Sequence, residues 1–600
     1  MSLTVEIVNE ERPFVSSQKI VAIVSVSSGG SIATPTEHDP GGDVAGTIGY
    51  GPGTDLAEEI LRQSSGGGTP TKVIHQKITG GVAGLCSSVT ETPSGTGPLI
   101  TVAGAPYDKY SASLWIVKAG ALGTARARLA LDGATYGDEF PIPVKLRGSF
   151  TSAIDLTGIV LADLNTLTLI ATSDIGGPIT VTFTTPSDIT DIATQITTQA
   201  ASGTDEFAAR IVSEKYLQIY SLTDGSTSTL SFGAGTANTI LGLTGSVTYT
   251  GSDSTYAIPN TGMTVTFPST SDYVVNTYYT WTTTQPRFSV AASTTAMDTL
   301  RDWALVNGVS IAHTFLLVDP VDGAETLQFA TALSARRAEW YASPYFRLCN
   351  FYMGASLHTA SATKATNDTN ITSNDAAIMA AMVSHVDPFV TVCVGDCYQT
   401  SGFGALRRSV LHWLALFESR ERDSADPGAG DLPGFSCISM KDAALTTLAR
   451  NELTATHKMR SARFTVARRE GADERISRGV TRANPALTPK FKHLGVVNAG
   501  LRAARAILPI AKLNENTDPL VAPSGKIRAE IGDAIEAAGN AELADKVVSP
   551  GHASAARLTV DRDEVISTTE NLTLTAEVQC NAQIISVALT VGVSGQFTVS

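Results

Sequence analysis

The sequence is poor in charged residues and in cysteine. Only 17% of its 600 residues are charged, whereas 43% are hydrophobic. So little charge is unusual for a free soluble enzyme and indicates that other subunits cover much of the surface. Six cysteines are too few for a disulfide scaffold, so reduced, buried thiols are expected. The sequence contains no apolar run of about 18 residues, so it predicts no membrane span. Its first residues do not resemble a signal peptide. We therefore expect a protein that is made and stays in a cytoplasm.

Recognisable catalytic signatures are also missing. We find no Walker loop, HExxH, GxSxG, Ser/His/Asp or Cys/His arrangement in a correct context. His313 in an apolar strand and His412 beside Trp413 are better explained as packing residues. Asp319 and Asp322 follow a strand, where α/β enzymes place catalytic groups, but a turn of sequence DPVDG explains them equally well. The sequence predicts no enzyme and no cofactor.

Two local patterns could hold a ligand. Cys393 and Cys397 lie close to His385, Asp387 and Asp396, but zinc sites use a shorter cysteine spacing and a second ligand pair. A buried strand over residues 388–394 followed by a turn is the better interpretation. The Gly-rich segments 41–53 and 64–69 bracket a short helix and fit neither phosphate-binding signature, which favours plain loop geometry. The sequence therefore predicts no metal site.

Positive charge is concentrated in one part of an acidic chain. Residues 450–512 contain fourteen Lys/Arg and four Asp/Glu, while the whole chain has a net charge of -14. This asymmetry predicts an anionic partner. Nucleic acid is one candidate, although one Phe near each cluster gives little to stack on bases; a solvated face and an acidic protein surface are the others.

The pattern of elements predicts several domains, because single cores stop growing at about 250 to 300 residues. The expected fold is α/β and α+β: an α/β core, a C-terminal α+β domain, inserted β-rich modules and extended terminal strand arms. The expected divisions are an N-terminal arm (1–27), a Gly-rich α+β outer domain (28–147), an inserted β-rich module (148–255), a return to the outer domain (256–300), the α/β core (301–434), a C-terminal inner domain with a basic face (435–581) and a C-terminal arm (582–600).

Both ends of the chain contain strand-like segments that need partners. Residues 3–8 form a short strand that cannot stabilise itself, and residues 584–593 form a long apolar edge that would aggregate if uncovered. Pairing within the subunit is one solution, and donation to the sheet of a neighbour is the other. The residues expected to pair between subunits are Leu3, Val5, Ile7, Ile584, Ile585, Val587, Leu589 and Val591.

The C-terminal third also contains two amphipathic segments. Residues 494–508 place Val497, Leu501 and Leu508 on one stripe and Arg502 with Arg505 on another. Residues 526–538 follow the same spacing. We expect two helices, each with one apolar face.

The order of these parts resembles a contractile tail sheath protein of a bacteriophage or a related injection system. The C-terminal domain is the most similar part, with ARFTVARREG, RGVTRANP, GVVNAGLRAARAI and KIRAEIGDAIEAAG in succession. GlyTyrGlyPro at 49–52 and the Thr-rich module fit the same order. Similar modules are inserted in sheath subunits and in flagellar hook-associated proteins.

This resemblance implies an assembly and a location. Sheath subunits stack as hexameric rings around an inner tail tube protein, with baseplate and tail terminator proteins at the ends. Contraction drives the tube through the target envelope. The subunits assemble in the host bacterial cytoplasm and become part of the virion tail, without membrane or direct nucleic-acid contact. Because sheath inner faces are commonly basic, the resemblance makes Lys490, Lys492, Arg502 and Arg505 the tube-facing candidates.

Two other classes of function remain open at this stage. A non-contractile filament or flagellar-type subunit would explain the inserted module, but flagellar subunits begin and end with long heptad-rich helices. A hydrolase or nucleic-acid-binding enzyme would need a convergent polar pocket, which a sequence does not reveal.

Overall fold

The computed structural model describes most of the chain. The described residues are 19–420 and 459–599, with gaps at 65–70, 79–80, 94, 132–133, 202–206, 224, 226, 244–246, 252, 269–270, 343–344, 346, 360–363, 402–403, 460–461, 471–472, 477–480, 484–492, 514–520, 565–571, 581–582, 588 and 592–596. They form two compact units. The first takes its described residues from Met1–Gly84, Pro106–Tyr110 and Thr284–Ser600, and the second from Leu85–Ala105 and Ser111–Thr283.

The first unit is built on an eight-stranded sheet of order β2-β3-β1-β19-β20-β21-β24-β25. The six inner strands run parallel, and the two edge strands run antiparallel to their neighbours. The strands are β2 (Thr36–His38), β3 (Thr71–Lys77), β1 (Lys19–Ser25), β19 (His313–Leu316), β20 (Asn350–Gly354), β21 (Val390–Val394), β24 (Thr465–Glu470) and β25 (Asp473–Ile476).

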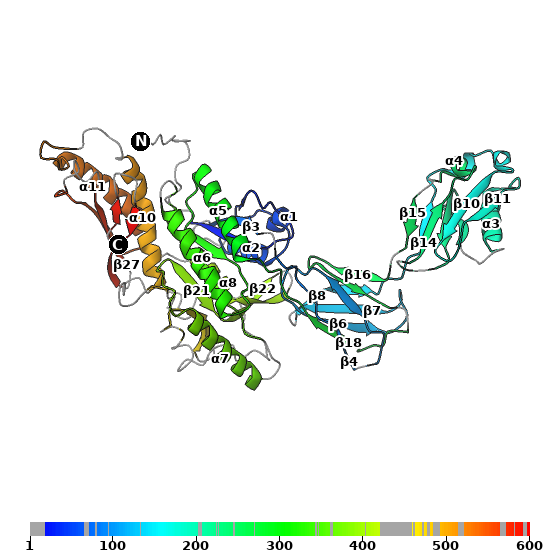
Figure 1. Ribbon diagram of the computed structural model, residues 1–600, viewed down its shortest axis with the longest axis horizontal. Helices are drawn as coiled ribbons and strands as arrows, with labels where there is room; N and C mark the ends of the chain where they lie inside the picture. Colours follow the sequence, from blue (N-terminus) through cyan, green and yellow to red (C-terminus); the bar gives the residue numbers. More distant parts are fainter. Residues whose placement is uncertain are drawn as a thin grey trace. The chain divides into compact units, whose positions relative to one another are not determined.

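Helices cover both faces of this sheet, as its inner strands require. Every residue of β19, β20 and β21 is buried, which is typical of parallel strands covered on both sides. Successive residues alternate between two cores: Ala22 belongs to one and Val21 and Ile23 to the other. The helices of this region are α1 (Val44–Ile48), α2 (Pro52–Ser64), α5 (Val290–Val306), α6 (Gly323–Tyr341), α7 (Lys364–Ala381) and α8 (Val410–Arg420), most of them labelled in Figure 1.

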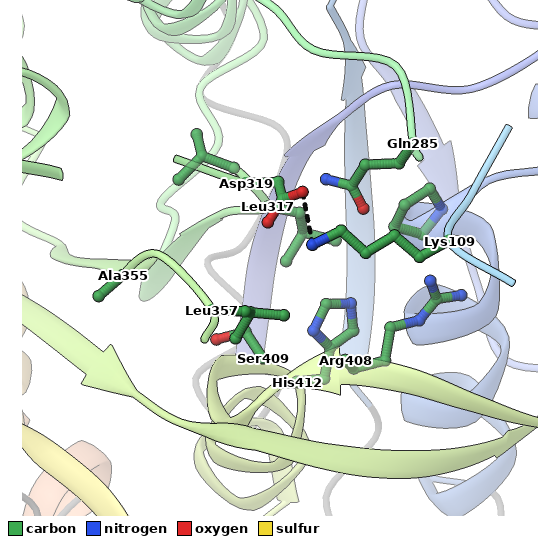
Figure 2. Close-up of a pocket in the computed structure, with 11 residues that line it drawn as sticks. Lys109, Gln285, Leu317, Asp319, Ala355, Leu357, Arg408, Ser409 and His412 are labelled. Carbon is green, nitrogen blue, oxygen red and sulfur yellow. Dashed lines mark ion pairs between the residues drawn. The ribbon is translucent and has the colours of Figure 1, made fainter. Parts of the chain in front are cut away.

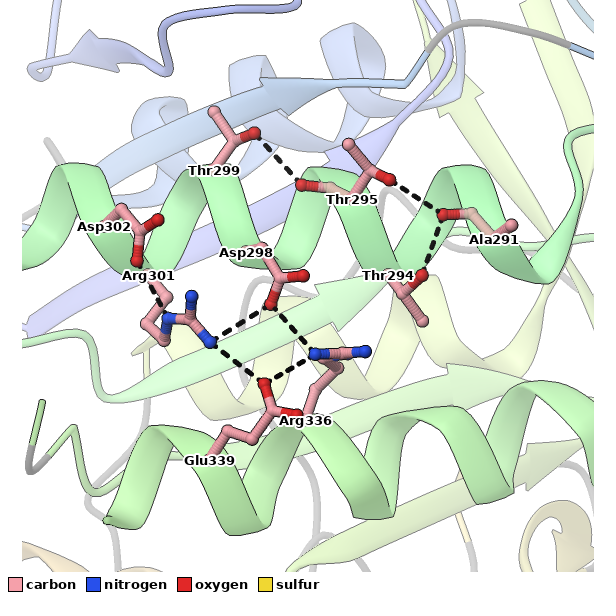
Figure 3. Close-up of polar contacts among 9 residues, drawn as sticks. All are labelled: Ala291, Thr294, Thr295, Asp298, Thr299, Arg301, Asp302, Arg336 and Glu339. Carbon is pink, nitrogen blue, oxygen red and sulfur yellow. Dashed lines mark hydrogen bonds and ion pairs between the residues drawn. The ribbon is translucent and has the colours of Figure 1, made fainter. Parts of the chain in front are cut away.

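An ion-pair network joins α5 to α6 on the surface of the sheet layer (Figure 3). Arg301, which is 9% exposed, contacts Asp298 at 3.2 Å and Glu339 at 3.0 Å, and Arg336 contacts the same two carboxylates at 3.4 and 2.5 Å. The Arg301 guanidinium also lies 4.0 Å from the ring centre of Tyr345. Shared carboxylates hold the two helices in register, which a single exposed pair does only weakly.

The C-terminal part of this unit packs helices against a small antiparallel sheet. The two helices are α10 (Leu494–Leu513) and α11 (Ala529–Leu543), which continues as a π-turn, Ala544–Val548. The strands are β26 (Ala555–Val560), β27 (Leu574–Cys580) and β28 (Gln583–Val587), followed by the hairpin of β29 (Leu589–Val591) and β30 (Phe597–Val599). In length and composition, Leu494–Ala511 could cross a membrane, but 67% of it is buried within the protein. This helix belongs to the core.

The second unit begins with two antiparallel sheets. One has the order β4-β18-β6-β7-β8 and the other β16-β17-β5. Phe140 stacks on Tyr256 with ring centres 3.8 Å apart, so the two sheets share an aromatic contact. The strands are β4 (Thr90–Thr92), β18 (Tyr278–Thr282), β6 (Ser111–Lys118), β7 (Arg126–Leu131), β8 (Ala134–Pro141), β16 (Thr255–Ile258), β17 (Met263–Thr266) and β5 (Thr101–Gly104).

Residues 148–250 of the second unit, called the inserted module below, have a core of their own. Leu169, Ile192, Phe207 and Ile219 are among the buried residues of that core. The sheets are β11-β10-β14-β15 and β12-β13-β9. The elements are β9 (Ser149–Thr151), β10 (Thr168–Ser173), β11 (Ile179–Thr182), α3 (Ile189–Ala200), β12 (Phe207–Val212), β13 (Tyr216–Ser221), β14 (Thr229–Phe232), α4 (Asn238–Leu241) and β15 (Thr248–Thr250), with 3-10 turns at Leu156–Gly158 and Leu161–Leu164.

The structure differs from the sequence prediction in three places. β1 is not part of an N-terminal arm but lies between β3 and β19 inside the main sheet, because its all-apolar run suits a strand that is covered on both faces. β2, α2 and β3 likewise belong to this sheet layer rather than to an outer domain. The apolar segment 406–419 predicts a single helix, but the helix starts at Val410, since residues 404–409 form β23 (Gly404–Ser409), paired with β22 (Asp396–Ser401).

Candidate functional site

The basic stretch of the sequence is partly internal. Arg482 is fully buried, and its guanidinium donates to the carbonyls of Ala462 at 2.7 Å, His385 at 3.0 Å and Met382. The same group lies 4.5 Å from the ring centre of Phe464. Burial, and next the charge of Arg463, lower the pKa of Arg482 to about 9. This arginine joins the end of the α7 region to the start of β24 rather than meeting a partner.

The four tube-facing candidates are placed differently from one another. Lys490 and Lys492 lie outside the described residues. Arg502 is only 9% exposed and donates through Nε to the Lys546 carbonyl at 2.8 Å. Arg505 is half-buried and donates to the Leu348 carbonyl at 2.7 Å. The stripe that carries both arginines is therefore largely covered at Arg502, and Arg505 is tied to its own chain.

Packing on several sides of α10 explains why Arg502 is covered. Val497 and Leu501 are buried, as the apolar stripe predicts, but Ala499, Ala503 and Ala506 are buried too. α10 contacts α11, β27 and β20, and small alanines leave room for close packing on more than one side of a helix. Periodicity marked one apolar face, whereas three alanines off that face form a second contact surface.

The terminal strands are described only at the C-terminus. Leu3, Val5 and Ile7 lie outside the described residues. β28 contains Ile584, Ile585 and Val587, and it pairs antiparallel with β27 of the same chain, with Ile585 opposite Val578. Leu589 and Val591 lie in β29, which pairs with β30. These C-terminal strands are thus paired within the chain, which is the alternative to the expected donation to a neighbour.

Both outer strands of the C-terminal sheet, β26 and β28, have one edge that pairs with no described strand. β28 stands last in the order β26-β27-β28, so among the described residues its other edge pairs with no strand. An open edge presents main-chain N–H and C=O groups to which another strand can add. The candidate interaction site of this region is therefore the outer edge of β28.

A buried polar network, which the sequence analysis did not find, connects α10 to the main sheet. Asn498 donates to Glu418 at 2.7 Å, and it accepts from Asn350 at 3.1 Å and from the Tyr352 hydroxyl at 3.2 Å. Tyr352 in turn lies 3.0 Å from Nδ1 of His313. All of these side chains are buried. His313 is thus a packing residue, with Nδ1 of its ring in contact with the Tyr352 hydroxyl. The amide of Asn498 is the centre of the network.

A small polar pocket lies where β19 and β20 end, at the carboxyl edge of the parallel strands (Figure 2). Open α/β sheets commonly bind ligands at this edge. Lys109 points into it and forms an ion pair with Asp319 at 2.6 Å. The pocket is lined by Pro52, Lys109, Gln285, Leu317, Val318, Asp319, Ala355, Leu357, Arg408, Ser409 and His412. Asp322 is not in the pocket: it caps α6 by accepting from the Glu325 N–H at 2.8 Å.

Behind the pocket, one arginine serves two buried carboxylates. Arg408 contacts Asp55 at 2.6 Å and also contacts Asp108, and all three side chains are at most 4% exposed. Burial, the largest effect, raises the pKa of Asp55, and the attraction of Arg408, the next largest, lowers it. The net result is a pKa of about 7. Burial lowers the pKa of Arg408, but the negative charges of Asp108 and Asp55 outweigh burial and raise this pKa. This triad fastens the segment Pro106–Tyr110 to α2 and β23.

The remaining polar groups of the pocket serve packing. Burial, and then the nearby charge of Arg408, hold the pKa of His412 well below its usual value, so the imidazole is neutral at pH 7. Ser409 accepts from the Leu411 N–H at 3.2 Å and so caps α8. Lys109 and Asp319 neutralise each other. Their described contacts are a helix cap and an ion pair, which hold the walls of the pocket together.

The residues of the possible metal cluster have other contacts. His385 lies 3.0 Å from Ser334 and 3.1 Å from the Ala330 carbonyl. Asp387 pairs with Arg337 at 3.0 Å. Cys393 is buried within β21, and the side chains of Asp396 and Cys397 lie outside the described residues. No group of three metal-ligand side chains gathers within the described part of the chain.

The Gly-rich segment 41–53 turns the chain between α1 and α2. Gly49 has φ +73°, and a Cβ there would lie 2.2 Å from the Ser28 hydroxyl and 2.5 Å from the Gly29 nitrogen. Only glycine fits this crossing of two loops. Gly49 thus serves loop geometry, whereas residues 65–69 of the second Gly-rich segment lie outside the described residues.

Comparison with known proteins gives one solved structure to report. No protein-family model matches the sequence, and no curated protein is similar to it. The chain is similar to the crystal structure of the sheath tail protein from Desulfitobacterium hafniense. That alignment covers 97% of this chain and 98% of the other at 11% identity, with a TM-score of 0.41. At this identity no residue role is transferred between the two proteins.

Proposed function

We propose that this chain is the structural subunit of a contractile tail sheath. In this proposal it polymerises as stacked hexameric rings around an inner tube, and contraction drives the tube through the target envelope. Baseplate and tail terminator proteins would bound the polymer, which assembles in the bacterial cytoplasm and ends in the virion tail. The support comes from the succession of C-terminal segments named above and from the contacts of the described residues.

The observation that carries the proposal is the open edge of β28. A polymer that keeps its connections while its subunits rotate needs a joint that is strong and yet tolerant of reorientation. Main-chain strand pairing provides both, because its hydrogen bonds do not depend on how the bodies behind the strand are oriented. The short strand predicted at residues 3–8 of a neighbouring copy would fit this edge.

The pairing of β28 with β27 suggests which terminal segment would receive a strand and which would donate one. The C-terminal strands of a subunit would form the receiving sheet, and the N-terminal residues Leu3, Val5 and Ile7 of the next subunit would supply the added strand. Deleting residues 582–600 would therefore remove part of the subunit's own sheet. The N-terminal segment is the cleaner place to test assembly.

The proposal also includes a basic inner face that meets the tube. Because Arg502 is buried and Arg505 bonds to its own chain, Lys490 and Lys492 remain as the tube-facing candidates. Exposed ion pairs are weak, at about 0 to 1 kcal/mol each. Such an interface suits a sheath that must release its tube.

Negative-stain electron microscopy of the concentrated full chain tests the proposal. We expect hollow, helically striated cylinders of uniform width. Cylinders of two distinct widths would support contraction, whereas a single width under every condition would favour a non-contractile filament. Discrete monomers, both alone and with the tube protein added, would contradict the proposal.

A matched pair of variants then tests the joint. Replacing Leu3, Val5 and Ile7 by Asp should leave a folded monomer that does not polymerise, because the added strand loses its apolar contacts. Changing the alternate position Glu6 to Lys serves as the control and should leave the cylinders unchanged. Normal cylinders from the triple variant would exclude the N-terminal joint while leaving polymerisation itself established.

A further inference from the structure

Side chains of α11 cover the outer edge of β26. Asn540 donates through Nδ2 to the Leu558 carbonyl at 3.2 Å, and its Oδ1 accepts from the Leu558 N–H at 2.7 Å. Glu536, one helical turn earlier, accepts from the Val560 N–H at 2.9 Å. The amide of Asn540 thus exchanges two hydrogen bonds with one strand residue, as a paired strand does.

Strand register shows that these main-chain groups face away from β27. Asp561, just after β26, donates its N–H to the carbonyl of Thr573, just before β27, at 2.9 Å. In an antiparallel pair, successive residues alternate between those that bond to the partner strand and those that face the other way. Leu558 and Val560 are three residues and one residue before Asp561, so their N–H and C=O groups lie on the outer edge.

Packing holds α11 close enough to reach this edge. Leu558 is fully buried, and a Cβ at Gly539 would lie 2.1 Å from the Leu558 Cδ2 atom. A side chain at position 539 would therefore push α11 away from β26. Arg562 pairs with Glu536 at 3.1 Å and orients its carboxylate. The fold of this region thus sets the positions of the groups that cover β26.

The inserted module covers an outer strand in the same way. β11 stands first in the order β11-β10-β14-β15. Gln199 of α3 accepts from the Thr182 N–H and donates to the Thr182 carbonyl, both at 2.9 Å. Gln195 makes the same two bonds with Thr184, both at 3.0 Å. Soluble proteins cover exposed strand edges to prevent the addition of other strands, and two separate helices of this chain do so with side-chain amides.

We propose that Asn540 and Glu536 close β26 against strand addition, so that a strand from a second copy of this chain joins the C-terminal sheet at β28. Both outer strands of that sheet have one side that pairs with no described strand, but bonds from α11 occupy that side of β26. A sheet with two open edges would accept a strand at either one, and the joint would vary between subunits. The inference rests on the proposed function for the donated strand, and it adds the residues that determine where this strand joins.

Hydrogen exchange of the full chain tests this inference, with mass spectrometry and fragmentation that resolves single amides. The protein is compared when dilute and when concentrated. We expect slow exchange at Leu558 and Val560 in the dilute wild type, because α11 already accepts from both N–H groups, and no change on concentration. Residues 583–587 of β28 should exchange about ten-fold more slowly after concentration, when a strand adds. Slower exchange of β26 on concentration of the wild type would overturn the inference.

A double variant of α11 removes the cover of β26. Asn540→Ala with Glu536→Ala should speed exchange at Leu558 and Val560 about ten-fold in the dilute protein. Concentration should then slow these amides again, because a strand from another copy adds to β26. Thr559 lies between them and faces β27, so its amide should stay slow. Glu530→Ala, at an exposed position of the same helix, is the matched control and should change no amide of β26.

Conservative variants separate the lost bonds from a loss of folding. Asn540→Asp and Glu536→Gln keep an oxygen acceptor at each position and should keep both amides slow. The inference is overturned if the dilute double variant exchanges like the wild type, if Thr559 becomes equally fast, or if β26 of the variant stays fast on concentration while β28 becomes slow. If β28 stays fast in every protein, the proposed function fails, and the dilute comparison alone decides whether α11 closes β26.

Discussion

Asn498 on α10 donates a hydrogen bond to Glu418 on α8 across 2.7 Å, and both side chains are buried. The same amide oxygen accepts from Asn350 and Tyr352 on β20. One side chain thereby connects the C-terminal helix to the central sheet. Buried polar networks of this kind fix one arrangement of elements, because any other would leave a group unpaired.

Asn498→Ala should lower the free energy of unfolding by about 2–4 kcal/mol. The substitution leaves the carboxylate of Glu418 and the partners on β20 buried without this donor and acceptor. Urea unfolding followed by circular dichroism measures the change. Asn165→Ala, at an exposed position, is the control and should shift stability by less than about 0.5 kcal/mol. Equal effects of the two would show that the network contributes nothing.

Arg482→Lys should also destabilise the fold, by about 2–4 kcal/mol. A lysine has no planar fork with which to satisfy three carbonyls from two segments of the chain, and it keeps a buried charge. Thermal unfolding gives the comparison. Arg128→Lys retains an exposed cation and should have little effect. A fully stable Arg482→Lys protein would contradict the role given to the guanidinium.

Arg502→Glu should impair folding of the monomer rather than assembly alone. The substitution places a carboxylate against the Lys546 carbonyl in a nearly closed site, at an expected loss of about 3–5 kcal/mol. Soluble yield and melting temperature of the monomer report this directly. If the variant melts like the wild type and fails only to assemble around the tube, the original exposed placement of Arg502 would be restored.

Asp55 should make stability depend on pH in an unusual direction. Its pKa is about 7 in the folded state, against an ordinary value of 3.8, so between these values the folded state binds more protons than the unfolded state. Stability from this group is complete below pH 3.8 and is lost as the pH rises through about 7. Asp55→Asn should reduce the fall in melting temperature between pH 5 and pH 8.

Buried His75 also changes how stability depends on pH, so variants must be compared instead of one pH profile of the wild type. Burial lowers the pKa of His75 to about 3, so this group has the opposite sign and costs stability as the pH falls below its ordinary value of 6.5. His75→Gln should reduce a loss of stability as the pH falls from 6.5 toward 3, whereas Asp55→Asn should reduce a loss of stability as the pH rises from 3.8 toward 7. An identical profile for the wild type and Asp55→Asn would show that Asp55 titrates normally.

Local pattern was enough to predict several elements well. Ile189, Ile192 and Ile196 are three or four residues apart, a spacing that predicts a helix, and the structure shows α3 there. The apolar runs around His313 and Val390 predict covered strands, and these are strands of the parallel sheet. These signals lie within a few consecutive residues, and burial of one face requires them. For Asp322 the sequence left a catalytic role and a turn equally open, and the structure shows the N-cap of α6, which is a local hydrogen bond.

Structural features that depend on contacts between distant segments were not predicted. The long run of β1 was assigned to an arm, because sequence does not show that β3 and β19 lie on either side of it. Arg502 was placed on an exposed face because alanines are weak markers of burial. The pocket combines Lys109, Asp319 and His412, which are far apart in the sequence, and so their meeting had no sequence signal.

The sequence by itself determined the classes of element, the uneven distribution of charge and the resemblance to a sheath, since each depends on residue types and short spacings. Tertiary structure decided which charges remain on the surface. Arg482 and Arg502 became internal donors to carbonyls, whereas Arg147 and Arg210 gathered around Tyr220. The physical reason is that the free energy of a charge depends on its surroundings, and only the packed chain sets those surroundings.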